Sequence, residues 1–337
     1  MLLSLPRIPL VHGPTPLRPL SRLGAELGID LWVKRDDMTG GADAGNKLRK
    51  LELLFAEALA RGATHVVTCG GIQSNHARAT ALVAASLGIR AVLLLRTTSD
   101  AERGARPSGN VLLDRLAGAE IRWVTPDEYR RRADEMASVA ETIRRDGGTP
   151  YVIPEGGSNA LGAMGYALAM CEIREQVARG EGPSSRNGIA FDSIVLACGS
   201  GGTAAGAMLG AAREGVAAHV VAIAVCDDED YFRAAIDRLC GEADARYRLP
   251  GPSLTSLDVI DGYKGPGYAQ SYPEMRATML RAARTEGLVL DPVYTGKAFH
   301  ALCTEGRALG NRVLFLHTGG LPGLLASGAD LADDLRS

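Results

Sequence analysis

The sequence predicts an α/β protein whose mainly parallel sheets carry helices on both faces. Strand-like runs alternate with helical segments through almost the whole chain, and this order is typical of parallel sheets. The strand-like runs are rich in Val, Ile and Leu without a polar alternation, as expected for strands that are buried on both faces. A length of 337 residues is that of about two domains.

Seven runs are expected as strands, because each is short, apolar and bounded by turn residues. In chain order they are Thr64–Thr68, Ile89–Leu95, Glu120–Val124, Pro150–Ile153, Ser193–Ala197, His219–Val225 and Arg312–Leu316. The helices expected between them include Leu48–Arg61, Asn75–Leu87, Asp127–Arg145, Ala160–Ala178, Ala204–Arg213 and Pro273–Thr285. Several helical segments close on a glycine, which commonly ends a helix: Gly62, Gly88, Gly118 and Gly180.

The composition excludes several classes of protein. Because 37 basic side chains are balanced by 39 acidic ones, the charge gives no reason to expect a nucleic-acid partner or an anionic membrane. A content of 46% hydrophobic and 23% charged residues excludes wholesale disorder. The uncharged stretch Ile194–Ala212 contains five glycines, which suits a turn between two elements better than a membrane span.

The cysteines and histidines indicate neither disulfides nor a metal site. None of the six cysteines forms a C-x-x-C pair or a zinc-like spacing with histidine, so we expect reduced thiols, a cytoplasmic protein and no metal. His12, His65, His219 and His300 have no carboxylate or cysteine at ligand spacing and are expected to be structural. No basic segment precedes an apolar run at the N-terminus, so no signal peptide is expected.

Lysine is rare in this chain. Only five of the 37 basic residues are lysines, and they are Lys34, Lys47, Lys50, Lys264 and Lys297. Codon bias is the ordinary explanation for such a preference for arginine. Arginine does not deprotonate, however, so the positions that remain lysine are candidates for amine chemistry.

The first motif is Gly45-Asn-Lys-Leu-Arg-Lys50, which opens a predicted helix. Lys47 would lie at the helix N-terminus, where the positive end of the dipole disfavours an ammonium and lowers its pKa. Lys50 lies on the same helical face and would lower this pKa further or bind an anion. The alternative is a pair of solvated lysines on a surface helix.

The second motif is Gly70-Gly-Ile-Gln-Ser-Asn-His-Ala-Arg78, directly after a predicted strand. It places Ser74, Asn75 and His76 at a strand end and a helix N-terminus, where ligands of open α/β sheets bind. The free backbone N–H groups there would meet a carboxylate or a phosphate. A plain turn capped by Ser or Asn is the alternative.

The third motif, Cys198-Gly-Ser-Gly-Gly-Thr203, leads from a strand into a helix and suits a phosphate cradle. It lacks the Gly-Lys-Ser/Thr of a P-loop and the first glycine of a nucleophile elbow. A dinucleotide site is a weaker interpretation: Asp227 and Asp228 follow the next strand, but the spacing is long and the final glycine of G-x-G-x-x-G is missing. A turn required only by packing is the other alternative.

Two further motifs are Asp291-Pro-Val-Tyr-Thr-Gly-Lys297 and His317-Thr-Gly-Gly320. Tyr294 and Thr295 would open a helix and Thr318 would end a strand, and both are places for polar contacts to a ligand. Thr295 has the alternative role of a helix cap. Tyr268 is a further candidate, although a loop tyrosine that covers the core is the default interpretation.

Taken in this order, the five motifs resemble those of the D-cysteine desulfhydrase / 1-aminocyclopropane-1-carboxylate deaminase family of pyridoxal-phosphate enzymes. The resemblance runs nearly end to end, from Gly13-Pro-Thr-Pro16 to His317-Thr-Gly-Gly320. It implies fold type II, the tryptophan-synthase β-like fold, with pyridoxal 5′-phosphate as cofactor. It also implies a small α/β domain, residues 51–156, inserted into a large cofactor domain formed by residues 1–50 and 157–337, and a homodimer.

The resemblance also implies roles for individual residues. Lys47 would form the Schiff base and act as the catalytic base. The phosphate would be held by Lys50 and by the loop Gly199, Ser200, Gly201, Gly202 and Thr203. Asn75 would face the cofactor's 3-hydroxyl, and Ser74 with the Asn75 and His76 backbone would receive the substrate carboxylate. Tyr268 and Tyr294 would line the substrate side as further catalytic groups.

Two threonines distinguish between branches of the family. Where the cyclopropane deaminases have glutamate and leucine, this chain has Thr295, expected beside the substrate, and Thr318, expected on the cofactor, as in the D-cysteine desulfhydrase branch. A carboxylate near the pyridine nitrogen would favour the protonated ring, the stronger electron sink, whereas a threonine hydroxyl can donate to an unprotonated nitrogen. The weaker sink suffices for β-elimination, but opening a three-membered ring demands more.

The leading hypothesis is therefore a lyase that eliminates the β-substituent of a small D-amino acid. D-Cysteine would give pyruvate, ammonia and hydrogen sulfide. The stretch Gly41-Ala-Asp-Ala-Gly45 departs from the usual Gly-Gly and puts Asp43 near the lysine loop, so other leaving groups, as in cysteate, stay open. The alternatives are cyclopropane-carboxylate deamination, a nucleotide-binding oxidoreductase that uses the Gly199 loop, and a non-catalytic cofactor-binding protein.

Overall fold

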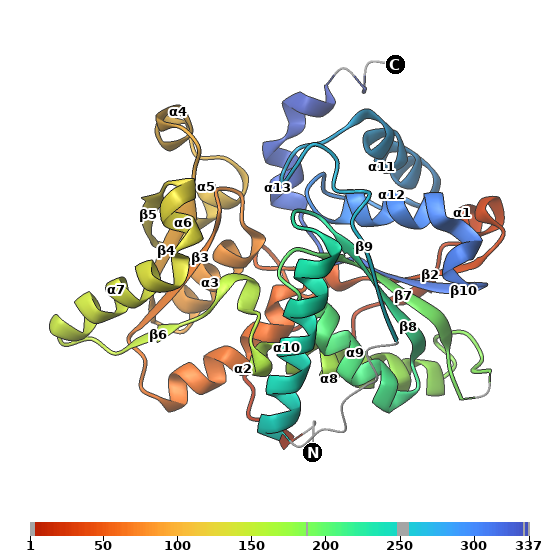
Figure 1. Cartoon of the computed structure of the whole chain (residues 1–337), viewed down its shortest axis with the longest axis horizontal. Coiled ribbons are helices and arrows are strands. Elements are labelled where there is room, and N and C mark those ends of the chain that lie inside the picture. Colours follow the sequence, from red (N-terminus) through yellow and green to blue (C-terminus); the bar gives the residue numbers. More distant parts are fainter. Residues whose placement is uncertain (1–3, 187, 248–255, 333, 336–337) are drawn as a thin grey trace.

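The computed structural model describes residues 4–186, 188–247, 256–332 and 334–335 and contains two sheets, which Figure 1 shows side by side. The larger sheet has the order β1 (Leu17–Pro19), β2 (Asp30–Lys34), β10 (Arg312–Leu316), β7 (Phe191–Cys198), β8 (Ala217–Ala224) and β9 (Leu257–Ile260). The smaller has the order β5 (Glu120–Val124), β4 (Arg90–Arg96), β3 (His65–Gly71) and β6 (Pro150–Val152). All neighbouring strands are parallel except β1, which is antiparallel to β2.

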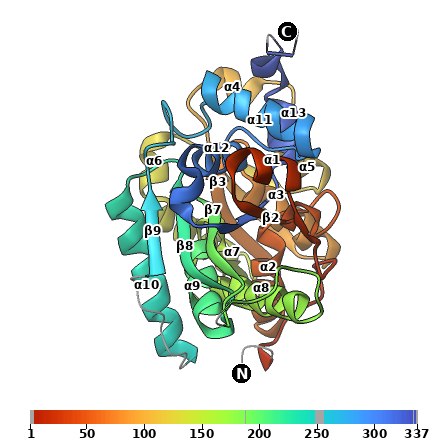
Figure 2. The same cartoon turned by 90° about the vertical axis from the view of Figure 1, so that its right-hand side faces the viewer.

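Helices cover both faces of both sheets, as the sequence predicts. The larger sheet lies between α8 (Ala160–Ala178) and α9 (Gly202–Glu214) on one face and α1 (Ser21–Leu27), α11 (Pro273–Glu286) and α12 (Thr295–Glu305) on the other, in both views (Figures 1 and 2). The smaller sheet packs against α3 (Asn75–Ser86) and α7 (Arg132–Arg145). The other helices are α2 (Lys47–Ala60), α4 (Asp100–Gly104), α5 (Gly109–Leu116), α6 (Pro126–Arg130), α10 (Glu229–Tyr247) and α13 (Leu321–Ala326).

The core explains the apolar strands. Neighbouring residues of β7, such as Ile194 and Val195, point to opposite faces of the larger sheet and pack in different hydrophobic clusters. Val66 and Val67 do the same in β3. Both faces are therefore buried, so the strands cannot show a polar alternation.

Most expected elements agree with the structure to within a few residues, and Ala160–Ala178 agrees at both ends. The expected helix Asp127–Arg145 is wrong as a single element, because the chain leaves helical geometry at Arg131 and forms α6 and α7. No glycine or proline marks this break. After it, the apolar side chains of α7, from Met136 to Ile143, are buried against the smaller sheet. Packing, which the sequence pattern does not reveal, thus divides the helix.

The strands of the smaller sheet all lie between His65 and Val152, and those of the larger sheet lie before and after them. The chain thus leaves the larger sheet after β2 and returns to it at β7. The proposed domain limits at residues 51 and 156 stay a prediction, and α2, which spans the first limit, packs mainly against α8. No helix within the described residues is long and apolar enough to cross a membrane.

Candidate active site

A cavity opens where the carboxyl ends of β3, β7 and β10 meet. Its wall contains the ends of strands from both sheets and the first residues of α2, α3 and α9. Ligands of open α/β proteins bind at this edge, where strand ends and helix N-termini converge. The residues that line it are Asn46, Lys47, Gly70, Gly71, Ser74, Asn75, His76, Glu155, Gly156, Ala197, Cys198, Gly199, Ser200, Gly201, Thr203, Ala204, Tyr268, Tyr294 and Thr318.

The structure brings together most of the residues that the sequence singled out, although they are spread over more than 270 positions of the chain. Three of the expected site residues do not line the cavity: Lys50, Gly202 and Thr295. Lys50 and Gly202 lie directly behind the wall, whereas the Thr295 side chain is committed elsewhere, as described below.

Lys47 is the first residue of α2, and its side chain lines the cavity. Burial lowers the pKa of its amine from 10.5 to about 8, against the opposing influence of Glu155 and Cys198. The sequence predicts this direction from the helix N-terminus, but desolvation is the larger cause. A minor fraction of Lys47, about a tenth at pH 7, is therefore a free amine, the form in which lysine acts as a nucleophile or a base.

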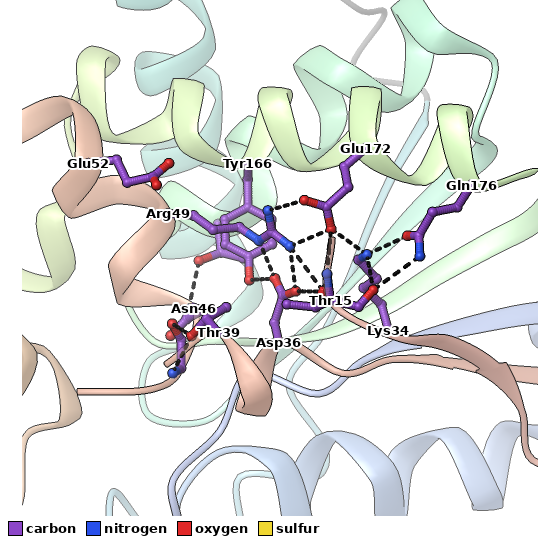
Figure 3. Close-up of polar contacts among 12 residues, drawn as sticks. Thr15, Lys34, Asp36, Thr39, Asn46, Arg49, Glu52, Tyr166, Glu172 and Gln176 are labelled. Carbon is purple, nitrogen blue, oxygen red and sulfur yellow. Dashed lines mark hydrogen bonds and ion pairs between the residues drawn. The ribbon is translucent and has the colours of Figure 1, made fainter. Parts of the chain in front are cut away.

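A buried polar network holds the start of α2 in place (Figure 3). Arg49, two residues after Lys47, donates from Nε and Nη2 to the Asp36 carboxylate at 2.7 and 2.8 Å. Arg49 also forms an ion pair of 2.9 Å with Glu172, and Tyr166 donates to Asp36 at 2.6 Å. Because Glu172 and Tyr166 belong to α8, the network fixes α2, the helix that begins with Lys47, against α8.

The same network continues to β2. The Lys34 ammonium donates to Glu172, Gln176 and the Thr15 carbonyl at 2.5, 2.5 and 2.7 Å. Arg49 and Lys34 hold the pKa of Asp36 at about 2 despite complete burial. Two cations and two carboxylates therefore balance each other in the interior, and each polar group has charged or hydrogen-bonding partners.

The loop from Gly199 to Thr203 forms a cradle at one end of the cavity. Gly201 has φ +80°, and a Cβ on Gly202 would lie 2.5 Å from Ser158 Oγ and 2.9 Å from Lys50 Nζ. Lys50 is buried and donates to the Gly156 carbonyl at 3.1 Å. An ammonium behind a glycine loop, at the N-terminus of α9, is an arrangement of donors that suits a phosphate.

The turn before α3 presents three polar residues to the cavity. Ser74 Oγ accepts from the Ala77 N–H and caps the helix, and Asn75 Oδ1 accepts from Asn110 at 3.1 Å. His76 Nε2 lies 2.9 Å from Thr68 Oγ1. Burial and the two lysines hold the pKa of His76 well below its usual value, so this imidazole is neutral.

Two tyrosines form another part of the wall. The hydroxyls of Tyr268 and Tyr294 are 2.6 Å apart, and the rings meet edge to face at 6.0 Å. Burial raises the pKa of Tyr268 to about 12, so both hydroxyls stay protonated and can donate.

The two threonines that distinguish the family branches have different surroundings. Thr318 follows β10 and lines the cavity, and its carbonyl accepts from the Asn46 N–H at 3.1 Å. Thr295 is fully buried and is outside the wall. Its hydroxyl donates to Asp291 Oδ1 at 2.6 Å and accepts from the Asp291 N–H at 2.8 Å. The expected contact of Thr295 with substrate therefore has no support in this geometry. The helix-cap alternative has none either, because the N-cap of α12 (Thr295–Glu305) is Tyr294 and the Asp291 carboxylate accepts from the N–H groups at the helix start.

Glu155 is a residue of the cavity wall that the sequence motifs did not indicate. It lies where the cavity opens into an outer cleft. Glu155 accepts from the Tyr129 hydroxyl at 2.6 Å and pairs with Arg132 at 2.9 Å. It follows the predicted strand Pro150–Ile153, and a polar residue just after a parallel strand is a signal that could have revealed it. In the same cleft, the Arg96 guanidinium stacks on the rings of Tyr129 and Tyr268 at 5.0 and 5.3 Å.

An amine of lowered pKa beside a glycine cradle backed by Lys50 fits pyridoxal phosphate, which needs one lysine for its aldehyde and a donor-rich pocket for its phosphate. A family model described as pyridoxal-phosphate dependent enzyme matches residues 8–319. The chain belongs to this family. Lys47, Lys50 and the Gly199–Thr203 loop are the residues that would hold the cofactor.

Relatives with known names narrow the class. The chain is 41% identical over 331 residues to a bifunctional D-cysteine desulfhydrase/1-aminocyclopropane-1-carboxylate deaminase of Arabidopsis thaliana, covering 94% of this chain and 78% of the relative. It is 39% identical over 335 residues to D-cysteine desulfhydrase of Yersinia pestis, covering 96% and 97%. The crystal structure of an ACC deaminase homologue matches with a TM-score of 0.87 at 37% identity, over 98% and 97% of the two chains.

These similarities make the protein a pyridoxal-phosphate-dependent lyase of the deaminase and desulfhydrase type. They also confirm fold type II and the family expected from the motifs. An O-ureido-L-serine synthase with a TM-score of 0.65 is 19% identical, and it supports the fold alone.

Proposed function

We propose that the protein catalyses β-elimination from D-cysteine: hydrogen sulfide leaves, and one water hydrolyses the remaining enamine to pyruvate and ammonia. The observation that carries this proposal is the presence of Thr318 in the cavity wall. A carboxylate is close by, because a Cβ on Gly320 would lie 2.5 Å from Asp291. The Asp291 carboxylate, however, does not line the cavity. It accepts hydrogen bonds from the N–H groups and the Thr295 hydroxyl at the start of α12.

Bound pyridoxal phosphate supplies an electron sink for the α-carbon of an amino acid joined to it. A hydroxyl at Thr318 can donate to a neutral pyridine nitrogen, whereas a carboxylate would stabilise its protonated form. The neutral ring is sufficient when a good leaving group departs from the β-carbon. Thr318 therefore favours elimination over the opening of a cyclopropane ring.

Lys47 is the residue we propose as the base at the α-carbon. Its pKa of about 8 leaves part of the amine unprotonated near neutral pH and also lets the resulting ammonium return the proton.

The proposed binding of the substrate carboxylate uses the turn before α3. Ser74 and the N–H groups of Asn75 and His76 stand at the positive end of that helix, which attracts an anion. Tyr268 and Tyr294 supply hydroxyl hydrogens on another part of the wall, where we place the substrate's side chain.

Deamination of 1-aminocyclopropane-1-carboxylate is the second candidate, because the relatives' names include both activities. Cysteate is favoured by one further observation. The Arg96 guanidinium makes no hydrogen bond or ion pair with another described residue, and the outer cleft that it lines is continuous with the cavity along Tyr268. A free guanidinium in this position suits an anionic β-substituent.

The deciding experiment compares four substrates. Release of pyruvate is measured with D-cysteine, L-cysteine and cysteate, and release of ammonia is measured with 1-aminocyclopropane-1-carboxylate. We expect D-cysteine to be the fastest and Lys47→Ala to be inactive. Faster turnover of the cyclopropane, or full turnover by Lys47→Ala, would contradict the proposal. Thr318→Leu should slow elimination, because leucine cannot donate to the ring nitrogen.

We also infer a homodimer in the cytoplasm. The homodimer rests on the family resemblance and is tested by sedimentation of the cofactor-bound protein. The location is supported by the cysteines, all six of which are free thiols, and it is tested by cell fractionation.

A further inference from the structure

Lys297 is a buried lysine that the proposed reaction does not use. It lies in the first turn of α12, and its side chain is fully removed from solvent. The ammonium donates to the carbonyls of Lys264 and Gly267 at 2.7 Å each and to the carbonyl of Val225 at 3.4 Å. All three N–H donors thus have an acceptor, and two of the acceptors belong to the loop that carries Tyr268.

This loop, residues 263–272, needs such support. The Tyr272 hydroxyl donates to the Tyr263 carbonyl at 2.9 Å and closes its base. Next to Tyr268, Ala269 has φ +60°, and no other non-glycine residue in the described part of the chain has a positive φ. A non-glycine residue in this region is strained and persists only where its surroundings hold it.

We propose that Lys297 is a positioning residue that fixes the loop 263–272 and so sets the Tyr268 hydroxyl against Tyr294 at the substrate. The inference rests on the proposed function in one respect, because it takes the two tyrosines to contact substrate. Lys297 and Tyr294 are both at the start of α12, so this helix end holds the loop at three points: the carbonyls of Lys264 and Gly267 and the hydroxyl of Tyr268.

The geometry also explains why this position is lysine in a chain that otherwise prefers arginine. Three carbonyls converge on one point, which matches the three N–H bonds of an ammonium. A planar guanidinium spreads its donors over a larger fork and does not match three acceptors that surround one point. The groups that face the ammonium are the Asp291 carboxylate and the Cys226 thiol, and burial lowers its pKa to about 8.

The test is a double-mutant cycle on the cofactor-bound enzyme. Lys297→Met should raise the KM for D-cysteine about tenfold, with cofactor content retained. In a Tyr268→Phe background the same substitution should change KM less than twofold, because the group that it positions is gone. An equal effect of Lys297→Met in both backgrounds overturns the proposal, since a purely structural lysine would act independently of Tyr268.

Lys264→Met is the matched control. Its side chain leaves the loop and pairs with Asp261 at 3.1 Å, so we expect KM within twofold of the parent. If Lys297→Met does not fold, Lys297→Gln takes its place in the cycle.

Hydrogen exchange of loop 263–272 provides a readout that does not depend on the substrate. Exchange there should accelerate at least tenfold in the Lys297 variant and stay unchanged in Lys264→Met. Unchanged exchange in the Lys297 variant overturns the proposal. If the parent enzyme does not release pyruvate from D-cysteine, the proposed function fails, and the exchange result still decides the role of Lys297.

Discussion

Asp36→Asn tests whether the buried network in Figure 3 holds α2, the helix that begins with Lys47. The Asp36 carboxylate is completely buried and accepts from Arg49, Tyr166 and the Thr15 hydroxyl. An asparagine of the same size keeps one acceptor oxygen and loses the charge. Arg49 would then keep Glu172 as its remaining anionic partner.

The size of the expected change in the free energy of unfolding follows from the pKa of Asp36, which is about 2 instead of its ordinary 3.8. This difference corresponds to roughly 2.5 kcal/mol of stability at neutral pH. Because the folded-state pKa is the lower one, this stability is present above pH 3.8 and is lost as the pH falls towards 2, with about 1 kcal/mol gone by pH 3. Removing one partner of a buried ion pair typically costs 3–5 kcal/mol, so we expect a loss of about 3 kcal/mol at pH 7.

Urea unfolding of the parent and the variant at pH 7 and pH 3 measures both quantities. Asp244→Asn is the control, because Asp244 is exposed on α10 and should change stability by less than about 0.5 kcal/mol. An Asp36→Asn variant as stable as the parent at pH 7, or a gap that does not narrow at pH 3, would refute the reasoning.

Three further predictions concern the cavity. Gly202→Ala should weaken cofactor binding at least tenfold in an absorbance titration, because the new methyl group has no space in the cradle. Gly241→Ala is the control: a Cβ at this position on α10 has nothing within 4 Å, so cofactor binding should stay unchanged. In cofactor-free protein, acylation of Lys47 followed by peptide mapping should show a midpoint near pH 8, and a midpoint near 10.5 would contradict the burial argument. Tyr268→Phe should retain the cofactor and lower kcat/KM about 3- to 10-fold through the loss of one hydrogen bond, and an unchanged kcat/KM would remove the Tyr268–Tyr294 pair from substrate recognition.

Local patterns predicted those parts of the site that are formed by one strand end and one helix start. The turn at Ser74 and the loop at Gly199 each contain their own glycines and cap, so the sequence revealed both. Glu155 and Arg96 were missed because their roles depend on partners that the fold brings from other elements. The position of Thr295 could not be predicted for the same reason. Its hydroxyl was expected beside the substrate, but it donates to Asp291 on the preceding turn.

The lysines connect the sequence observation to the energetics of the fold. Lys34, Lys50 and Lys297 are almost completely buried and donate to carbonyl or carboxylate oxygens, while Lys47 lines the cavity and Lys264 forms a surface ion pair. Codon bias accounts for the abundance of arginine but not for which positions escape it. Burial alone does not account for it either, because the guanidiniums of Arg49 and Arg78 are also buried. At Lys34 and Lys297 three acceptor oxygens surround one nitrogen, which suits the three N–H bonds of a compact ammonium better than the planar fork of a guanidinium. At Lys47 the property that matters is different, because only an amine can lose its proton and act as the nucleophile or base that we propose.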